Sequence, residues 1–85
     1  MITKSIMVDI PSGMGARPAA MLVQVASQYE SSIYLEDEAV KVNAKSIMGM
    51  MALGLAPGSE IKVTASGEDE KSAVEAIEKY LKNNS

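Results

Sequence analysis

The sequence contains no cysteine and no histidine, and it has neither tryptophan nor phenylalanine. Without cysteine, the chain forms no disulfide bond and offers no thiolate to a metal ion or a substrate. Without histidine, it lacks imidazole, the side chain that most often transfers protons in catalysis and that binds zinc. We therefore expect a protein that is not an enzyme and that needs neither a metal ion nor another cofactor.

Positive charge is also scarce, since the net charge is −3 at pH 7, which argues against electrostatic binding to nucleic acid. The apolar run near the amino terminus is broken by Asp9 and Pro11 and is too short for a signal peptide or a membrane span. The sequence therefore predicts a cytoplasmic protein that binds no membrane. With 85 residues, of which 47% are hydrophobic, it predicts one small globular domain over residues 1–85.

Hydrophobic periodicity predicts seven elements of secondary structure. Period-two alternation is typical of half-buried strands, and apolar residues three and four apart are typical of helices. The predicted order is a strand at residues 2–10, a helix at 16–28, strands around Ile33–Leu35 and Val40–Val42 joined by a turn at 36–39, a short helix after Ser46, a strand around Ile61–Ala65, and a last helix capped by Asp69. Helices that alternate with an antiparallel sheet pack on one of its faces, so we expect a two-layer α+β sandwich.

The predicted helices each have an apolar stripe that should face the sheet. These stripes are Ala19, Leu22, Val23 and Ala26 in the first helix, and Ala73, Val74, Ile77, Tyr80 and Leu81 in the last. The acidic clusters at residues 36–38 and 68–70 lack the spacing of a metal site with supporting ligands. We interpret them as a solvated turn and a helix cap.

The segment SGMGARPA, residues 12–19, leads from a turn into the first helix. Gly15 is an acceptable N-cap, and Pro18 suits a first turn, where no intrahelical N–H is missed. Helix starts favour anions, and the Arg17 guanidinium can hold a carboxylate or phosphate with two hydrogen bonds. Alternatively, Arg17 is only a solvated charge. Gly15 offers no side chain that can react.

Ser46 occupies the expected N-cap position of the short helix, where a serine oxygen accepts a hydrogen bond from a backbone N–H. The simplest interpretation is that it does nothing more. A phosphate on Ser46 would however add nearly two negative charges at a helix amino end, where the dipole and free N–H groups favour them. Such a modification would change the surface without costing the fold much.

The residues after Ser46 are apolar on every side of the helix. We expect Met50 and Leu53 to serve the core, and Ile47, Met48 and Met51 to remain partly exposed. An exposed patch rich in methionine suits a surface that adapts to a partner protein. The alternative is that the methionines fill gaps in the core.

The segments SGMGARPA, VNAKSIMGMMALGLAPGSEI and SGEDEKSAVEAI, in this order and spacing over the whole chain, resemble the histidine-containing phosphocarrier proteins (HPr) of the bacterial sugar phosphotransferase system. The resemblance implies an open-faced β-sandwich of four antiparallel strands with three helices on one face. In this family the phosphorylated histidine precedes the ARPA motif, and the corresponding residue here is Gly15. Glycine has nothing to phosphorylate, so the family's phosphocarrier chemistry is not expected.

The motif KSIMG resembles the regulatory site of HPr from low-GC Gram-positive bacteria, where HPr kinase/phosphorylase phosphorylates the serine. Carried onto this chain, that serine is Ser46. In the family, the phosphorylated form binds the repressor catabolite control protein A. The resemblance implies that the contacts come from Ser46, from Ile47, Met48 and Met51, and from Arg17.

A branch of the family that lacks the active histidine and keeps the regulatory serine is called catabolite repression HPr (Crh), and the chain resembles this branch. The branch generally has glutamine where this chain has Gly15, so any hydrogen bond from that side chain to the repressor is absent. Two other hypotheses stay open: a phosphocarrier that acts with Enzyme I, and a repurposed HPr-like domain that binds another partner.

Overall fold

The computed structural model describes residues 1–9, 16–38, 40–53 and 58–82, with the backbone alone for residues 16–18. In this part of the chain the elements are β1 (Ile2–Met7), α1 (Ala16–Ser27), β2 (Ser32–Glu36), β3 (Lys41–Asn43), α2 (Ile47–Leu53), β4 (Glu60–Ser66) and α3 (Glu70–Lys82). Their kinds and their order are those predicted from the sequence.

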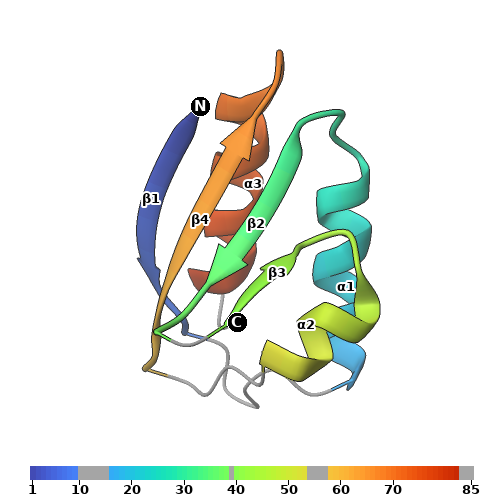
Figure 1. The fold of residues 1–85 in the computed structure, drawn as a ribbon, viewed down its shortest axis with the longest axis vertical. Helices are drawn as coiled ribbons and strands as arrows, with labels where there is room; N and C mark the ends of the chain where they lie inside the picture. The colour runs from blue at the N-terminus through green and yellow to red at the C-terminus, as the bar shows by residue number, and fades with distance from the viewer. Residues whose placement is uncertain (10–15, 39, 54–57, 83–85) are drawn as a thin grey trace.

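The four strands form one antiparallel sheet in the order β1-β4-β2-β3, with β4 hydrogen-bonded to both β1 and β2. The helices of the described residues all cover the same face of this sheet and leave the other face open (Figure 1). The predicted open-faced sandwich of four antiparallel strands and three helices is therefore confirmed.

The first strand is shorter than predicted, because β1 ends at Met7 rather than at residue 10. Beyond Met7 the backbone leaves the ladder: the N–H of Val8 donates to the carbonyl of Ser59 at 2.7 Å, and the N–H of Asp9 donates to that of Leu81 at 2.8 Å. Val8 is nevertheless fully buried. The apolar alternation predicted the burial of Val8 correctly. It did not predict the end of the strand, which is set by the last pair with β4, Met7 and Glu60.

The hairpin of β2 and β3 is present, but its turn lies later than predicted. Glu36 is the last residue of β2 and pairs with Lys41. Val40, predicted as a strand residue, belongs to the turn: its N–H donates to the Asp37 carboxylate at 2.8 Å, and its carbonyl accepts from the Asp37 N–H at 3.0 Å. An Asp side chain that bonds the backbone a few residues on favours a turn over a longer strand. The solvated-turn interpretation of residues 36–38 thus holds for Asp37.

The core lies between the sheet and the helices. The strand residues that face the helices and the helix residues that face the sheet are buried. They are Ile6, Ile33, Leu35, Ile61, Val63 and Ala65 from strands, and Ala19, Leu22, Ala26, Met50, Leu53, Ala73, Val74, Ile77 and Leu81 from helices. The predicted stripes are confirmed except that Val23 and Tyr80 are only partly buried. Burial also raises the pKa of the Tyr80 hydroxyl.

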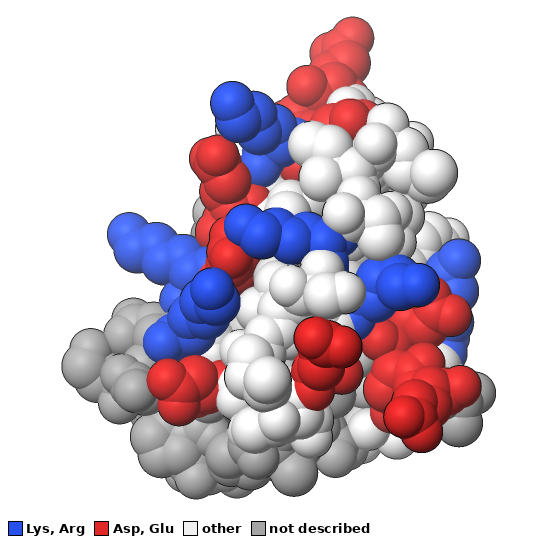
Figure 2. All heavy atoms as spheres, turned by 90° about the vertical axis from the view of Figure 1, so that its left-hand side faces the viewer, with Lys and Arg blue, Asp and Glu red and all other residues white. Residues whose placement is uncertain are grey.

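Lys4 breaks the apolar alternation of β1, and an ion pair explains why it is tolerated. Its Nζ lies 2.7 Å from an oxygen of Glu78 on α3, and Nζ of Lys82 lies 3.3 Å from the other oxygen. Hydrogen bonds from these lysines, Lys4 first, hold the pKa of Glu78 below its ordinary value. Figure 2, which views the β1 side, shows acidic and basic side chains intermixed there. This flank therefore presents no field of a single sign.

The carboxylate of Asp69 joins the start of α3 to the turn before β2. It accepts hydrogen bonds from the hydroxyl of the buried Ser31, from the N–H of Glu30 at 2.9 Å and from the N–H of Ser31 at 3.0 Å. These bonds, led by that of the Ser31 hydroxyl, lower the pKa of Asp69. The carbonyl of Asp69 accepts from the N–H of Ala73 at 2.9 Å, which confirms the predicted capping position. The side chain in addition links two segments that are distant in sequence.

Gly67 makes this junction possible. It has a positive φ of 154°, and a Cβ at this position would lie 2.5 Å from the Ser31 hydroxyl oxygen and 2.7 Å from the Ser31 Cα. Gly58 also has a positive φ, of 88°, but a Cβ there would meet nothing within 4 Å. Both glycines thus have a positive φ, and they differ in the space around the missing Cβ.

Gly67→Ala should lower the free energy of unfolding by about 3 kcal/mol, because steric overlap with Ser31 adds to the strain of positive φ. Gly58→Ala is the matched control and should cost only about 1–2 kcal/mol, the strain alone. Urea unfolding followed by circular dichroism measures both. Equal losses in the two variants would contradict the steric role of Gly67.

The Asp69 junction should make stability depend on pH. Because the pKa of Asp69 is lower in the folded chain, the unfolded chain binds more protons as the pH falls below about 4, so this stabilisation is present at neutral pH and lost in acid. Asp69→Asn should therefore be less stable than the unsubstituted chain at pH 7, and the difference should shrink towards pH 2.

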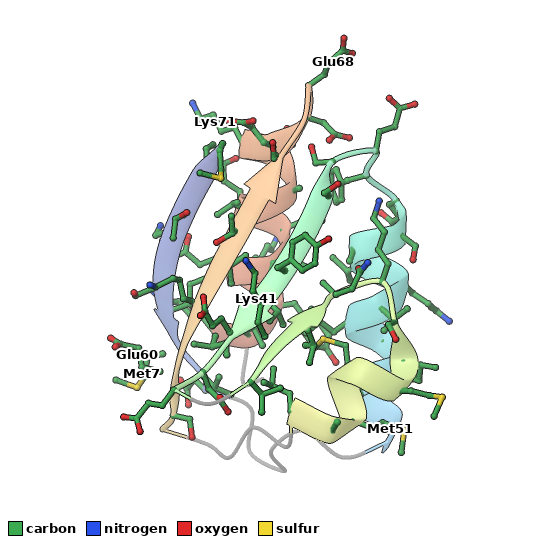
Figure 3. All side chains as sticks on the ribbon, in the orientation of Figure 1. Met7, Lys41, Met51, Glu60, Glu68 and Lys71 are labelled. Carbon is green, nitrogen blue, oxygen red and sulfur yellow. The ribbon has the colours of Figure 1, made fainter. Side chains whose placement is uncertain are left out.

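Glu68→Gln provides the control for this titration, since it removes the same charge from a neighbouring side chain that extends away from the body of the molecule (Figure 3). It should leave the pH dependence of urea unfolding nearly unchanged. A pH profile of Asp69→Asn that parallels the unsubstituted chain would argue against the role assigned to this carboxylate.

Candidate functional site

Ser46 immediately precedes α2 and caps it. Its hydroxyl oxygen accepts from the N–H of Gly49 at 3.2 Å, and its carbonyl accepts from the N–H of Met50 at 2.9 Å. Its own N–H donates to the carbonyl of Asn43 at 3.0 Å. The predicted N-cap is confirmed. The side chain is half-buried, so part of it faces solvent.

The turn that carries Ser46 is held on both sides. The N–H of Lys45 donates to the Asn43 side-chain oxygen at 2.8 Å, and its Nζ reaches the carbonyl of Tyr29, just after α1, at 2.7 Å. The buried Ala44 donates its N–H to the carbonyl of Ile33 in β2 at 2.9 Å. The sheet and the end of α1 therefore fix the place at which the Ser46 hydroxyl is presented.

The helix behind Ser46 buries one side and exposes the other. Met50 is fully buried and Leu53 is 6% exposed, whereas Ile47, Met48 and Met51 are 38%, 80% and 50% exposed. At 3.6 residues per turn, the last three lie within about a third of the helix circumference. The predicted exposed surface is confirmed, and we call Ile47, Met48 and Met51 the α2 apolar surface.

The surroundings of this surface carry little charge. The sequence of α2 contains no charged residue, and that of α1 contains only Arg17. The two helices pack against each other, and Figure 1 shows α2 beside the first turns of α1. Met21 of α1 is 46% exposed, a feature that the helical spacing alone did not single out.

Two predicted site residues, Arg17 and Gly15, lie at the edge of the described part of the chain or outside it. α1 begins at Ala16, so Arg17 lies in its first turn as predicted, but the Arg17 side chain lies outside the described part of the structure. Gly15 lies wholly outside the described residues. The predicted contact of Arg17 with a partner therefore stays a prediction.

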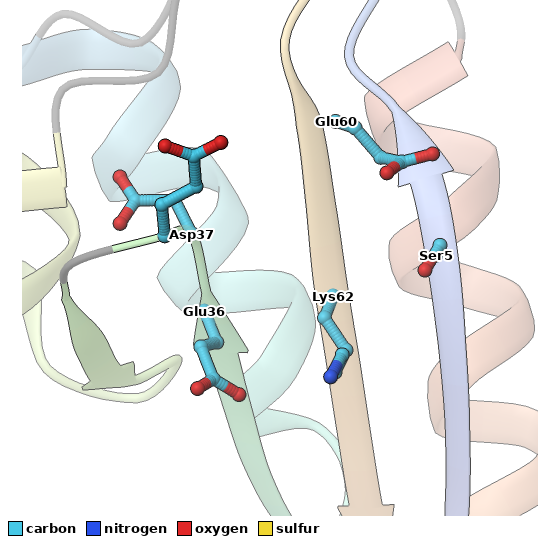
Figure 4. A pocket seen from close by; sticks show the side chains of 6 residues that line it. Ser5, Glu36, Asp37, Glu60 and Lys62 are labelled. Carbon is cyan, nitrogen blue, oxygen red and sulfur yellow. The ribbon is translucent and has the colours of Figure 1, made fainter.

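The open face of the sheet has a different character. Ser5, Glu36, Asp37, Glu38, Glu60 and Lys62 line a shallow hollow of about 330 Å³ at one end of it (Figure 4). Lys62, on β4 between β1 and β2, is the one cation among the residues that line the hollow. Among the described residues, no group of three or more Asp, Glu, His or Cys side chains is arranged to hold a metal ion. No helix in this part of the chain has the length and apolar character that a membrane crossing requires.

The open-faced α+β sandwich, with a capping serine before an uncharged apolar helix, has the architecture that the resemblance to HPr implies. A family model described as "PTS HPr component phosphorylation site" matches residues 2–83. The chain belongs to the HPr family.

The chain is similar both to relatives named Crh and to relatives named HPr. The HPr-like protein Crh of Bacillus subtilis is 43% identical over 81 residues, which cover 95% of each chain. The phosphocarrier protein HPr of Treponema pallidum is 45% identical over 83 residues, covering 98% of this chain and 94% of its own. A crystal structure of a phosphocarrier protein HPr from Bacillus anthracis superposes with a TM-score of 0.91 at 41% identity, covering 94% of this chain and 95% of that one. These comparisons define the family, and the individual residues must distinguish its branches.

Ser46→Ala should lower the free energy of unfolding by about 1 kcal/mol, because the N–H of Gly49 loses its side-chain acceptor at the helix start. Ser46→Asp should retain most of the stability, since aspartate is also a favoured cap. Ser72→Ala, at an exposed position of α3, is the control and should cause no loss. A Ser46→Ala chain as stable as the unsubstituted one in urea would contradict the capping role.

Proposed function

We propose that this chain is a regulatory HPr-like protein of carbon catabolite repression. In this proposal HPr kinase/phosphorylase phosphorylates Ser46, and the modified chain acts as a corepressor by binding catabolite control protein A. The observation that carries the proposal is the combination of a well-placed serine at the KSIMG motif with the complete absence of histidine. The similarity to a relative named Crh supports it.

The absence of histidine argues against a phosphocarrier function. A carrier needs a nucleophile whose bond to the phosphoryl group is easily broken again, and imidazole provides one. Gly15 provides no nucleophile at the position that precedes the ARPA motif, and no histidine elsewhere can replace it. A phosphate ester on a serine is a poor donor to another protein. The chain can thus accept a regulatory phosphate without being able to relay one.

The surroundings of Ser46 favour a phosphate that stays in place. The first N–H groups of a helix have no intrahelical acceptor, and Ile47, Met48 and Gly49 supply such groups next to the serine. A phosphate adds nearly two negative charges and three acceptor oxygens within reach of this helix end. Neither α2 nor its neighbour α1 has an acidic residue that would repel it.

The phosphate would create a mixed recognition surface. It would place charge at one end of the α2 apolar surface, where Met48 and Met51 project flexible, polarizable side chains. A partner that offers a basic group beside an apolar pocket fits both features. Arg17 in the first turn of α1 adds a cation that can bind a carboxylate of the partner. Gly15 contributes no side-chain hydrogen bond to this contact.

The proposed modification is tested with purified HPr kinase/phosphorylase and ATP. Intact mass and peptide mapping should place one phosphate on Ser46, Ser46→Ala should stay unmodified, and Ser72→Ala should be modified normally. With phosphoenolpyruvate and Enzyme I, the chain should acquire no acid-labile phosphate. Acid-labile phosphate there would favour the phosphocarrier hypothesis instead.

The proposed contact is tested by the affinity of the phosphorylated chain for catabolite control protein A. Met48→Ala and Met51→Ala should each weaken binding by about 1–2 kcal/mol, as expected for anchor side chains that enter an interface. Met7→Ala is the matched control, because Met7 is as exposed as Met51 but lies on β1. An affinity that the α2 substitutions leave unchanged, or that is the same without the phosphate, would refute this contact and favour a repurposed domain.

A further inference from the structure

The sulfur chemistry of this chain belongs to methionine alone, because the sequence has seven methionines and no cysteine. Their exposure differs sharply within a single helix. Met48 is 80% exposed and Met51 is 50% exposed, while Met50 between them is fully buried. Figure 3 shows Met51 at the end of the molecule formed by α2 and the first turns of α1. An oxidant in solution therefore reaches two of the three methionines of α2.

We propose that Met48 and Met51 are oxidation sites at which hydrogen peroxide converts the thioether to a sulfoxide and thereby releases the docked partner. The inference rests on the proposed function, since it uses the same surface. In the reaction the sulfur lone pair attacks one peroxide oxygen, the O–O bond breaks, and the second oxygen leaves as water after taking a proton. The sulfur is oxidised by two electrons and the peroxide is reduced by two.

Oxidation of these sulfurs would make the α2 apolar surface polar. A sulfoxide turns a flexible apolar side chain into a polar one, and burying its oxygen without a hydrogen-bond donor is unfavourable. The side chains of α2 carry no charge and no N–H or O–H group, so the helix surface has no donor of its own for a new S=O group. Docking would therefore bury the sulfoxides without a partner from this helix.

The fold itself should survive. Met50 packs in the core with Leu53 and stays inaccessible, so the residues that attach α2 to the sheet keep their apolar character. The Ser46 cap uses a hydroxyl oxygen and a backbone N–H, neither of which reacts with peroxide. Oxidation thus removes the docking chemistry while leaving the phosphorylation site intact. Because methionine sulfoxide reductases reverse the reaction, the change is a switch rather than damage.

The oxidation pattern is measured on the chain alone. Dilute peroxide is added for increasing times, each oxygen being counted as about 16 Da of added mass and located by peptide mapping. Of Met7, Met48, Met50 and Met51, the most exposed, Met48, should react first, Met51 and Met7 should follow at similar rates, and the buried Met50 should react last, while Met1 should react about as fast as Met48 because it is equally exposed. In urea, the four should react at similar rates. Oxidation of Met50 as fast as Met48 in the folded chain would overturn the proposed selectivity.

The consequence is measured with the Ser46-phosphorylated chain and catabolite control protein A. Peroxide should weaken binding about tenfold or more, as the loss of one or two anchors does, and treatment with methionine sulfoxide reductases should restore it. In the double variant Met48→Leu, Met51→Leu, whatever its affinity before treatment, peroxide should leave that affinity unchanged, because leucine has no thioether to oxidise. The double variant Met7→Leu, Met21→Leu is the control, and its affinity should still fall after peroxide treatment.

The outcomes separate the two proposals. If the untreated phosphorylated chain does not bind the repressor, the proposed function fails and the inference fails with it. If the untreated chain binds and the oxidised chain binds equally well, only the inference fails. If the Met48→Leu, Met51→Leu variant loses affinity as much as the unsubstituted chain does, the sulfurs of α2 are not responsible.

Discussion

The packing of α2 onto the sheet through Met50 and Leu53 is the interaction on which the candidate site depends. The helix has only seven residues and is apolar on every side, so burying these two side chains forces others to face solvent. Ile47, Met48 and Met51 are exposed because a domain of 85 residues has no second layer to cover them. The same packing sets the direction of the helix and therefore the place of Ser46 at its start.

Gly49 allows this packing to be close. A Cβ on Gly49 would lie 3.2 Å from the Cβ of Val42 on β3 and 3.4 Å from the Ser46 hydroxyl oxygen. The small residue thus brings the first turn of α2 against the sheet edge and leaves room for the serine to bond the Gly49 N–H. The glycine of the KSIMG motif consequently has a physical reason that is separate from recognition by any partner. Gly49 is therefore explained by the packing and capping of α2 alone, whatever partner Ser46 meets.

Local patterns were sufficient to predict the kinds and order of the elements, the two-layer arrangement and the Ser46 cap, whereas the open-faced form came from the family resemblance. Alternation in β4 and helical spacing in α3 each depend on residues near one another in sequence, and the Ser46 cap involves a residue only three positions away. Contacts between distant segments were not predictable. The carboxylate of Asp69 bonds to Ser31, and Lys4 pairs with Glu78, yet neither link has a signature within its own segment. Such pairs become visible only when the topology has brought the segments together.

Under the proposed function, the chemistry of Ser46 would explain how regulation can be separated from phosphoryl transfer in one fold. In the folded chain the hydroxyl oxygen acts as an acceptor for the N–H of Gly49, and an ester oxygen with phosphate attached keeps acceptor atoms at the same place. The helix cap therefore requires an acceptor at this position, not a free hydroxyl proton. The position that would carry a transferable phosphate, Gly15, lies before α1 in the sequence, whereas Ser46 caps α2. Under the proposed function, the two positions are independent, so a chain of this family can lack the transferable phosphate and still present a serine that a stable phosphate would modify.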